Sequence, residues 1–207
     1  MSEVLHRDQI ERLNKDGEQT VAELFSKHND QFRRLLDFRM DRRLLGRVDS
    51  SDILQEAYLD AVNRIDHYLK EPQVSIFVWL RGIVNQTLIN VHRRHIGVQA
   101  RDAAREEKLN KGGPHTSSDS LAAHLVGHLT SPSQAAMKAE MTMRLEEALD
   151  GMDEIDREVL ILRHFEELSN NEVAEILELQ KAAASNRYVR ALGRLKKTLE
   201  STPGFFG

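Results

Sequence analysis

Histidines and carboxylates are the side chains of this sequence that could hold a metal ion for catalysis. The chain has nine His residues and no Cys, so a metal site would need His and carboxylate ligands. His92 and His95 stand three residues apart, but the two arginines between them would repel a cation. The spacing His-Glu-x-x-His does not occur. A metal-dependent enzyme is therefore a disfavoured alternative, and the sequence predicts no catalytic residue, no metal and no cofactor.

A second group of polar residues indicates binding rather than catalysis. Apolar residues at three- and four-residue spacings predict a helix from Ser50 to Ile65, with Asp49 as its N-cap. No basic residue occurs between Val48 and Asn63, so the outer side of this helix should be acidic. The polar residues expected on that outer side include Asp52, Gln55 and Glu56.

Basic residues gather at the end of a further predicted helix, from Ser75 to Arg94. Ile76, Leu80, Ile83, Thr87 and Val91 form its apolar stripe, and an aromatic beside such a stripe, Trp79, belongs more often to a core than to a binding site. Arg93 and Arg94 close the helix, where cations interact favourably with the helix dipole. Helix termination and phosphate contact are therefore both open for this pair.

The last third of the chain predicts a helix-turn-helix. Ser169 and Glu172 form a capping box that opens a short helix, and Leu179 falls in the turn after it. A second helix follows from about Lys181, with six basic and no acidic residues up to Lys197. Hydroxyl and amide groups can bond base edges, and cations neutralise phosphates. The predicted DNA-binding side chains of this helix are Lys181, Ser185, Asn186, Arg187, Arg190 and Arg194, while Ala182 would offer only a methyl group.

Composition predicts an all-α protein of two small helical domains. Aromatic residues make up 5% of the 207 residues, prolines number four, and hydrophobic residues make up 40%, which suffices for two cores. Residues 106–131 contain Gly-Gly-Pro and a Ser/Thr/Asp cluster, which predict a flexible linker. The predicted domains are therefore residues 1–105 and 132–207, the second opening with a helix at Ser131–Gln134.

Residues 49–65, with the core Asp-x-x-Gln-Glu, resemble region 2.2 of the extracytoplasmic-function (ECF) branch of the sigma-70 family. Residues 75–95 resemble regions 2.3 and 2.4, and residues 156–197 resemble region 4, the helix-turn-helix. The resemblance implies a sigma factor that binds core RNA polymerase and directs promoter-specific initiation. The polymerase would perform all the chemistry.

The resemblance also implies roles for individual residues. It assigns Asp52, Gln55 and Glu56 to polymerase binding, and region 4 to the duplex minus-thirty-five element. Region 2 would read and melt the minus-ten element and hold the single strand. The region 2 residues expected to contact DNA are Arg81, Asn85, Gln86, Asn90, Arg93 and Arg94.

Location and partners complete these expectations. No apolar run approaches the ~20 residues that cross a bilayer, so no membrane insertion and a cytoplasmic location are expected. An anti-sigma factor is a further partner that the resemblance leaves open. The alternative function is a helix-turn-helix transcription regulator that acts without being a polymerase subunit, and residues 49–65 argue against it.

Overall fold

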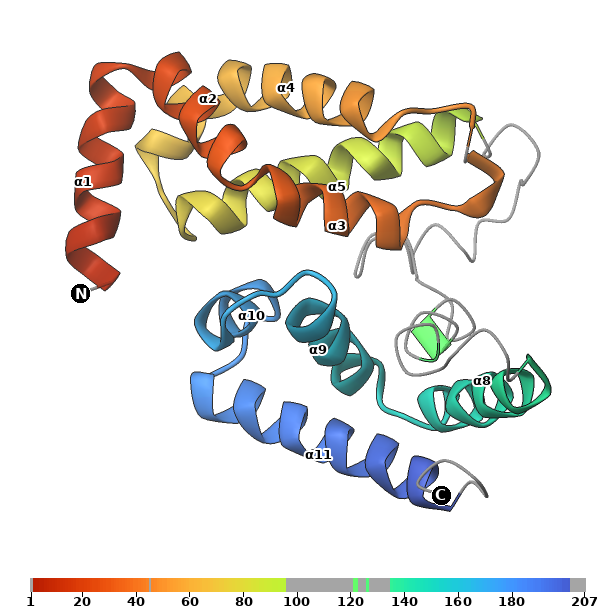
Figure 1. The fold of residues 1–207 in the computed structure, drawn as a ribbon. Coiled ribbons are helices and arrows are strands. Elements are labelled where there is room, and N and C mark those ends of the chain that lie inside the picture. The colour runs from red at the N-terminus through yellow and green to blue at the C-terminus, as the bar shows by residue number, and fades with distance from the viewer. Residues whose placement is uncertain (1, 45, 96–120, 123–125, 127–134, 202–207) are drawn as a thin grey trace. The chain divides into compact units, whose positions relative to one another are not determined.

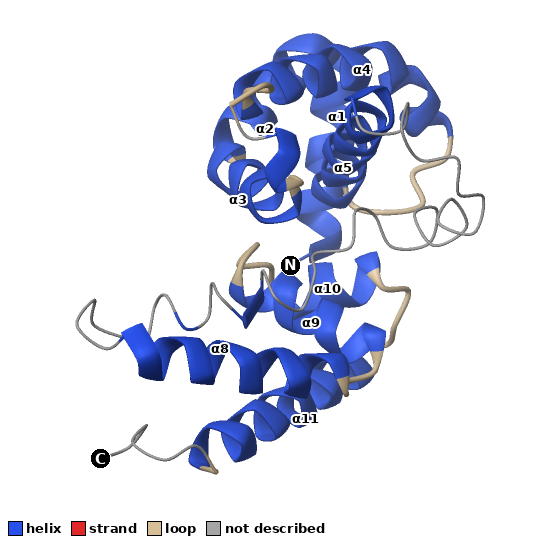
Figure 2. Ribbon diagram, turned by 90° about the vertical axis from the view of Figure 1, so that its right-hand side faces the viewer, coloured by secondary structure: helices blue, strands red, loops and turns tan. Residues whose placement is uncertain are grey.

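The computed structural model describes residues 2–44, 46–95, 121–122, 126 and 135–201, and every regular element among them is a helix (Figure 2). The prediction of an all-α protein is therefore confirmed. The described helices fall into two compact units, one within residues 1–115 and one within residues 116–207. The boundary between the units lies inside the predicted linker, residues 106–131.

Within that linker, Leu121, Ala122 and Val126 are helical and fully buried, which its polar composition did not predict. Ala122 and Val126 are four residues apart, a spacing that places two residues on one face of a helix. The rest of the predicted linker lies outside the described residues, and so does the helix start expected at Ser131–Gln134.

Up to residue 95, the described part of the first unit contains five α-helices and a short 3-10 helix: α1 (Ser2–Lys15), α2 (Gly17–Lys27), α3 (Asn29–Arg39), η1 (Arg42–Leu44), α4 (Ser50–Lys70) and α5 (Ile76–His95). In Figure 1, α5 runs between α4 and α3 and packs against both. It is the central helix of the unit, with eleven of its 20 residues buried. The predicted stripe of α5 is buried throughout, so this prediction is confirmed.

Local sequence signals account for the ends of α4. The Asp49 side chain accepts a hydrogen bond from the Ser51 amide at 2.8 Å, so the predicted N-cap is confirmed. This backbone hydrogen bond also lowers the pKa of Asp49, because it stabilises the carboxylate. At the other end, the Tyr68 hydroxyl donates to the Val74 carbonyl at 2.9 Å across the turn into α5.

Two features of the first unit differ from the helices that the sequence indicates. Apolar spacing predicts one helix from about Thr20 to Phe38, but this segment forms two, α2 and α3, with a break at His28. Asn29 and Asp30 follow the break, and such side chains favour the first turn of a helix over its interior. The polar start of the chain is helical as α1, which places Leu13 in the core.

The second unit contains α8 (Ala135–Asp150), α9 (Glu154–His164), α10 (Asn170–Ile176) and α11 (Lys181–Glu200). Helix α11 packs against α8, α9 and α10. The Asp153 side chain caps α9 by accepting from the Ile155 amide at 3.0 Å. Both halves of the predicted capping box at Ser169 and Glu172 are present at the start of α10.

Candidate functional site

The outer side of α4 is acidic and exposed, as predicted. Asp52, Gln55 and Glu56 are all exposed, whereas Ile53 and Leu54 between them are buried. Leu59 lies on the same face, because it follows Gln55 by four residues and Asp52 by seven, and 55% of it is accessible to solvent. The apolar side chain of Leu59 was not singled out from the sequence, although its spacing places it on this face.

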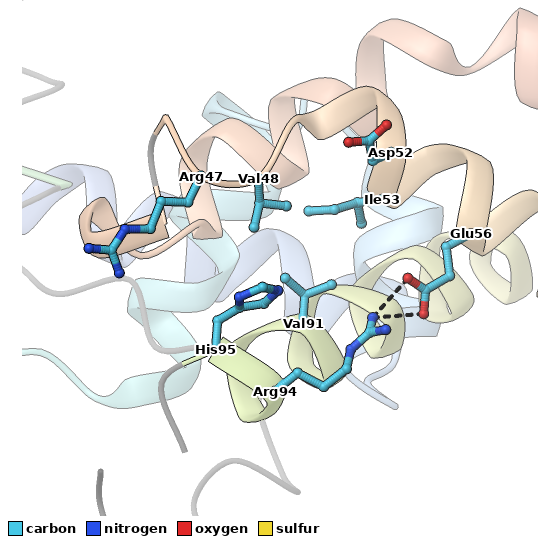
Figure 3. Close-up of a pocket in the computed structure, with 8 residues that line it drawn as sticks. All are labelled: Arg47, Val48, Asp52, Ile53, Glu56, Val91, Arg94 and His95. Atoms are coloured by element: carbon cyan, nitrogen blue, oxygen red, sulfur yellow. Dashed lines mark hydrogen bonds and ion pairs between the residues drawn. The ribbon is translucent and has the colours of Figure 1, made fainter. Parts of the chain in front are cut away.

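One carboxylate of this face is already engaged within the unit. Arg94 of α5 donates through one guanidinium nitrogen to both carboxylate oxygens of Glu56, at 2.8 Å each (Figure 3). Roughly half of each side chain remains accessible, 54% for Arg94 and 46% for Glu56. A residue expected to bind polymerase and a residue expected to bind DNA therefore contact each other, and the Asp52 carboxylate points away from this pair.

A shallow cavity adjoins the Glu56–Arg94 pair. It has a volume of about 200 Å³, which is smaller than the ~300–1,000 Å³ of typical small-molecule sites. Its walls therefore indicate a surface depression and not a substrate pocket. The residues that line it are Arg47, Val48, Asp52, Ile53, Glu56, Val91, Arg94 and His95 (Figure 3).

The residues of α5 predicted to contact DNA divide by depth. Gln86, Asn90 and Arg93 are exposed, and the Gln86 amide donates to the Asn90 side-chain oxygen at 3.2 Å. Asn85 is half-buried, and its side-chain oxygen is buried without a hydrogen-bond partner. Arg81 is only 7% exposed, so its guanidinium lies within the unit instead of on its surface.

Trp79 takes an intermediate position. It is half-buried, and its ring lies 4.7 Å from the Tyr68 ring at an interplanar angle of 31°. Phe77, on the other hand, is buried, with its ring stacked at 5.9 Å on Phe32 of α3. The core role predicted for Trp79 is therefore met only in part, whereas Phe77 is fully a core residue.

The His92 ring forms a hydrogen bond with a backbone amide. Its Nε2 accepts a hydrogen bond from the Asp41 amide at 3.3 Å, which requires the neutral ring. Burial lowers the pKa of His92, Arg43 lowers it further and the Asp41 carboxylate opposes the shift. Hydrogen bonds from Arg43 in turn lower the pKa of Asp41 to about 2. Across the described ranges, no three His or carboxylate side chains come together as a metal site would require.

Helices α10 and α11 form the predicted helix-turn-helix. In the turn, the Leu179 amide donates to the Ala174 carbonyl at 2.8 Å, and Ala174 is buried where the helices meet. The Asn170 side chain donates to the Lys181 carbonyl at 2.9 Å, which ties the two helix starts together. Glu178 occupies a left-handed conformation with φ of 53°, at a turn position where glycine is common because it adopts this conformation without strain.

Most of the predicted DNA-binding residues of α11 lie on its open side. Lys181, Ala182, Ser185, Asn186, Arg190 and Arg194 are all exposed. The buried stripe of the helix is narrow and consists of Ala184, Ala191 and Leu195. Tyr188 follows Ala184 by four residues, and the sequence spacing therefore predicts it in the same stripe; it is half-buried, and its hydroxyl pairs with His164 Nε2 at 3.1 Å.

Arg187 is held inside the second unit. It donates to Asp156 at 2.6 Å and to Asp153 at 3.3 Å, and its side chain is 25% accessible. The Asp156 side chain is only 5% accessible, and Arg190 approaches it at 3.6 Å. Asp156 was not singled out from the sequence, so this buried pair was missed. No local pattern could have found it, because the partners stand 31 residues apart.

Known sigma factors are similar in sequence to this chain. The family model described as "Sigma-70, region 4" matches residues 142–195. The chain is 27% identical to RNA polymerase sigma factor YlaC of Bacillus subtilis, over 94% of both chains. It is 22% identical to ECF RNA polymerase sigma factor SigW of the same organism, over 95% of this chain and 98% of the relative.

A solved structure of CnrH in complex with the cytosolic domain of CnrY has the same fold. It matches with a TM-score of 0.50 and 18% identity, and the match covers 95% of this chain and 97% of CnrH.

The chain therefore belongs to the sigma-70 family of RNA polymerase sigma factors. Within that family it is an ECF sigma factor, a non-catalytic subunit that directs transcription initiation. None of the helices in the described part of the chain is both long and apolar enough to cross a membrane. The comparisons give no support to a regulator that works apart from the polymerase.

Proposed function

We propose that this sigma factor divides promoter recognition between its two units and joins core RNA polymerase through α4. The first unit, the proposed sigma region 2, binds polymerase and the melted promoter strand. The second unit, the proposed region 4, grips duplex DNA further upstream. Each grip is weak alone, so only the complete polymerase complex selects a promoter.

The observation that carries this proposal is the exposed face of α4. Asp52 and Gln55 have solvent-exposed side chains with no basic residue near them along the helix, and Leu59 adds an apolar group beside them. Interfaces combine a small desolvated apolar centre with a polar rim. Leu59 is suited to that centre, and Asp52, Gln55 and Glu56 are suited to the rim against a basic surface of the polymerase.

The proposed DNA contacts of the first unit depend on how exposed each side chain of α5 is. Gln86 and Asn90 can bond the edges of unstacked bases, and Arg93 can pair with phosphate. Arg94 reaches DNA only when Glu56 releases it, and Arg81 only by leaving its buried position. Asn85 has an unpaired buried oxygen that a small movement would bring to a donor group of a base.

The second unit supplies the duplex contacts. Helix α11 presents Lys181, Ser185, Asn186 and Arg190 on its open side, and its first turns would enter the major groove. Arg194 would bind phosphate along the groove wall. Arg187 acts through its pair with Asp156, which holds α11 on α9 at a fixed angle. Arg187 is thus a positioning residue.

Partners and location follow from this assignment. The proposed partners are core RNA polymerase and promoter DNA, which place the protein in the cytoplasm. CnrH was solved with the cytosolic domain of CnrY, and we extend the idea of a bound protein partner to this chain. Such an anti-sigma factor would act by covering the α4 face.

The test removes the two carboxylates of α4. Asp52→Ala with Glu56→Ala should weaken association with core polymerase by tenfold or more, since rim charges and their desolvated partners together contribute more than about 1.4 kcal/mol. Fluorescence anisotropy of the labelled full chain with purified core polymerase measures this, and circular dichroism checks the fold. Asp66→Ala is the control, because Asp66 is an exposed carboxylate of the same helix, about 21 Å from Asp52 along the helix axis.

Unchanged association in the double variant, with Asp66→Ala equally silent, would overturn the assignment of α4. A second measurement addresses the alternative function. Nanomolar binding of a specific duplex by the purified chain, without polymerase and at physiological salt, would favour a regulator that is not a polymerase subunit.

A further inference from the structure

Helix α11 has an apolar side chain in the middle of its open side. Val189 is 63% exposed, more than Leu59, Met143 or Ile155. A single exposed valine is ordinary on a protein surface, so its neighbours decide its meaning. Ala182 precedes it by seven residues and Asn186 by three, which places all three on one face of the helix.

The charge around this face suits nucleic acid. Residues 181–197 contain six basic residues and no acidic one, so an anionic partner is favoured over a protein surface of mixed charge. Arg190, which follows Val189 directly, is exposed on one flank. A duplex is therefore the occupant that this face fits.

Few hydrogen-bonding groups remain on this face for reading bases. Arg187 is committed to Asp156 and Asp153, and its position on the helix turns it toward α9. Ala182, at the end of the helix that would enter the groove first, has no hydrogen-bonding group in its side chain. The direct readers of base edges are then Ser185, Asn186 and Arg190, alongside the methyl groups of Ala182 and Val189.

We propose that Val189, together with Ala182, reads thymine methyl groups in the major groove, so that this sigma factor selects thymines in its upstream duplex element. The inference rests on the proposed function of the second unit. The thymine methyl is the one apolar group that base pairs present in the major groove, and alanine and other methyl-bearing side chains contact it. Ala182 and Val189 lie about 10 Å apart along the axis, or about three base pairs at ~3.4 Å each.

The experiment uses holoenzyme assembled from core polymerase and the full chain. A promoter is selected from a library of random duplexes, and uracil then replaces thymine one position at a time in its upstream element. This change removes one methyl group and leaves every hydrogen-bonding group of the base pair in place. At one or more positions we expect promoter binding to fall about fourfold, the value for one buried methylene-sized group.

Substitution of Val189 identifies the reader. Val189→Ala should weaken binding to the thymine promoter about fourfold and should make uracil at one position harmless. Met143→Ala is the matched control, because Met143 is 55% exposed in the same unit but lies on α8. It should leave the sensitivity to uracil intact. The non-additivity of Val189→Ala with uracil is the specific signature of contact.

Three results would overturn the proposal. The first is that uracil replaces thymine without loss at every position, and the second is that the loss persists unchanged in Val189→Ala. The third is that Val189→Ala weakens association with core polymerase when promoter is absent, which would assign the face to protein. Arg190→Ala distinguishes failure of methyl reading from failure of the proposed duplex binding by the second unit. If it weakens promoter binding while uracil is neutral, only methyl reading fails, whereas if Arg190→Ala is silent and no upstream element is selected, both fail.

Discussion

Helices α5 and α11 both have 20 residues and both are assigned to DNA, yet the two units hold them in different ways. Helix α5 buries eleven residues at the centre of its unit. Among the described side chains of α11, only Ala184, Ala191 and Leu195 are buried. Helix α5 is therefore held by apolar area, whereas α11 depends on a narrow stripe of mostly small side chains and on a few directed contacts.

Two of the ion pairs that join different helices show the same difference. Arg187 binds Asp156, whose side chain is almost fully buried, and the pair joins α11 to α9. Arg94 binds Glu56 where both side chains are half accessible, and the pair joins helices already packed through their cores. The first pair should be structural, and the second should be free to exchange partners.

The largest effect is expected from breaking the buried pair. Arg187→Leu leaves the Asp156 carboxylate buried with only Arg190 near it, at 3.6 Å, and should destabilise the second unit by about 3 kcal/mol. Denaturant unfolding followed by circular dichroism measures the loss. Trp79, the single tryptophan, lies in the first unit, so the fluorescence transition should not move.

A double variant provides the control for this prediction. Arg187→Leu with Asp156→Leu removes the unpaired charge as well as the pair, and should recover stability to within about 1 kcal/mol of the wild type. If the single variant were as stable as the wild type, the distinction between a structural and an exchangeable pair would be lost.

Two exposed glycines offer a smaller and matched comparison. Gly82 of α5 and Gly193 of α11 both lie inside a helix, and a Cβ added to either would meet nothing within 4 Å. Gly82→Ala and Gly193→Ala should each stabilise by about 0.5–1 kcal/mol, because alanine loses less backbone entropy. Tryptophan fluorescence should report only the first change, and circular dichroism both. A loss of stability in either variant would mean that its helix is not open at that position.

Local signals predicted much of the fold, and tertiary contacts were beyond them. Asp49 and the Ser169–Glu172 capping box form hydrogen bonds with backbone groups within three residues, so neighbouring residues suffice to predict them. The Glu56–Arg94 pair spans 38 residues and depends on how α4 and α5 pack, which no periodicity specifies. Burial of Arg81 was missed for the same reason, since its polarity indicated the surface.

The left-handed backbone of Glu178 shows how far local sequence predicts backbone conformation. The sequence placed it in a turn where glycine is common, and its φ of 53° confirms that the turn keeps the conformation glycine would favour. The sequence alone did not indicate which other residues have a left-handed backbone conformation. Glu167, with φ of 54°, adopts the same conformation in the loop that follows α9, which ends at His164, and no local sequence pattern indicated it.

The smallest effect is expected at the exposed pair. Glu56→Gln and Arg94→Gln should each change the stability of the first unit by less than about 0.5 kcal/mol, with a similarly small coupling energy between them, because solvent screens pairs of this kind. Fluorescence-detected unfolding measures both quantities. A small value means that polymerase could take Glu56, and DNA could take Arg94, at little cost to the fold. A coupling of 2 kcal/mol or more would make the pair as structural as Arg187 with Asp156, and the contrast between the two units would then rest on core burial alone.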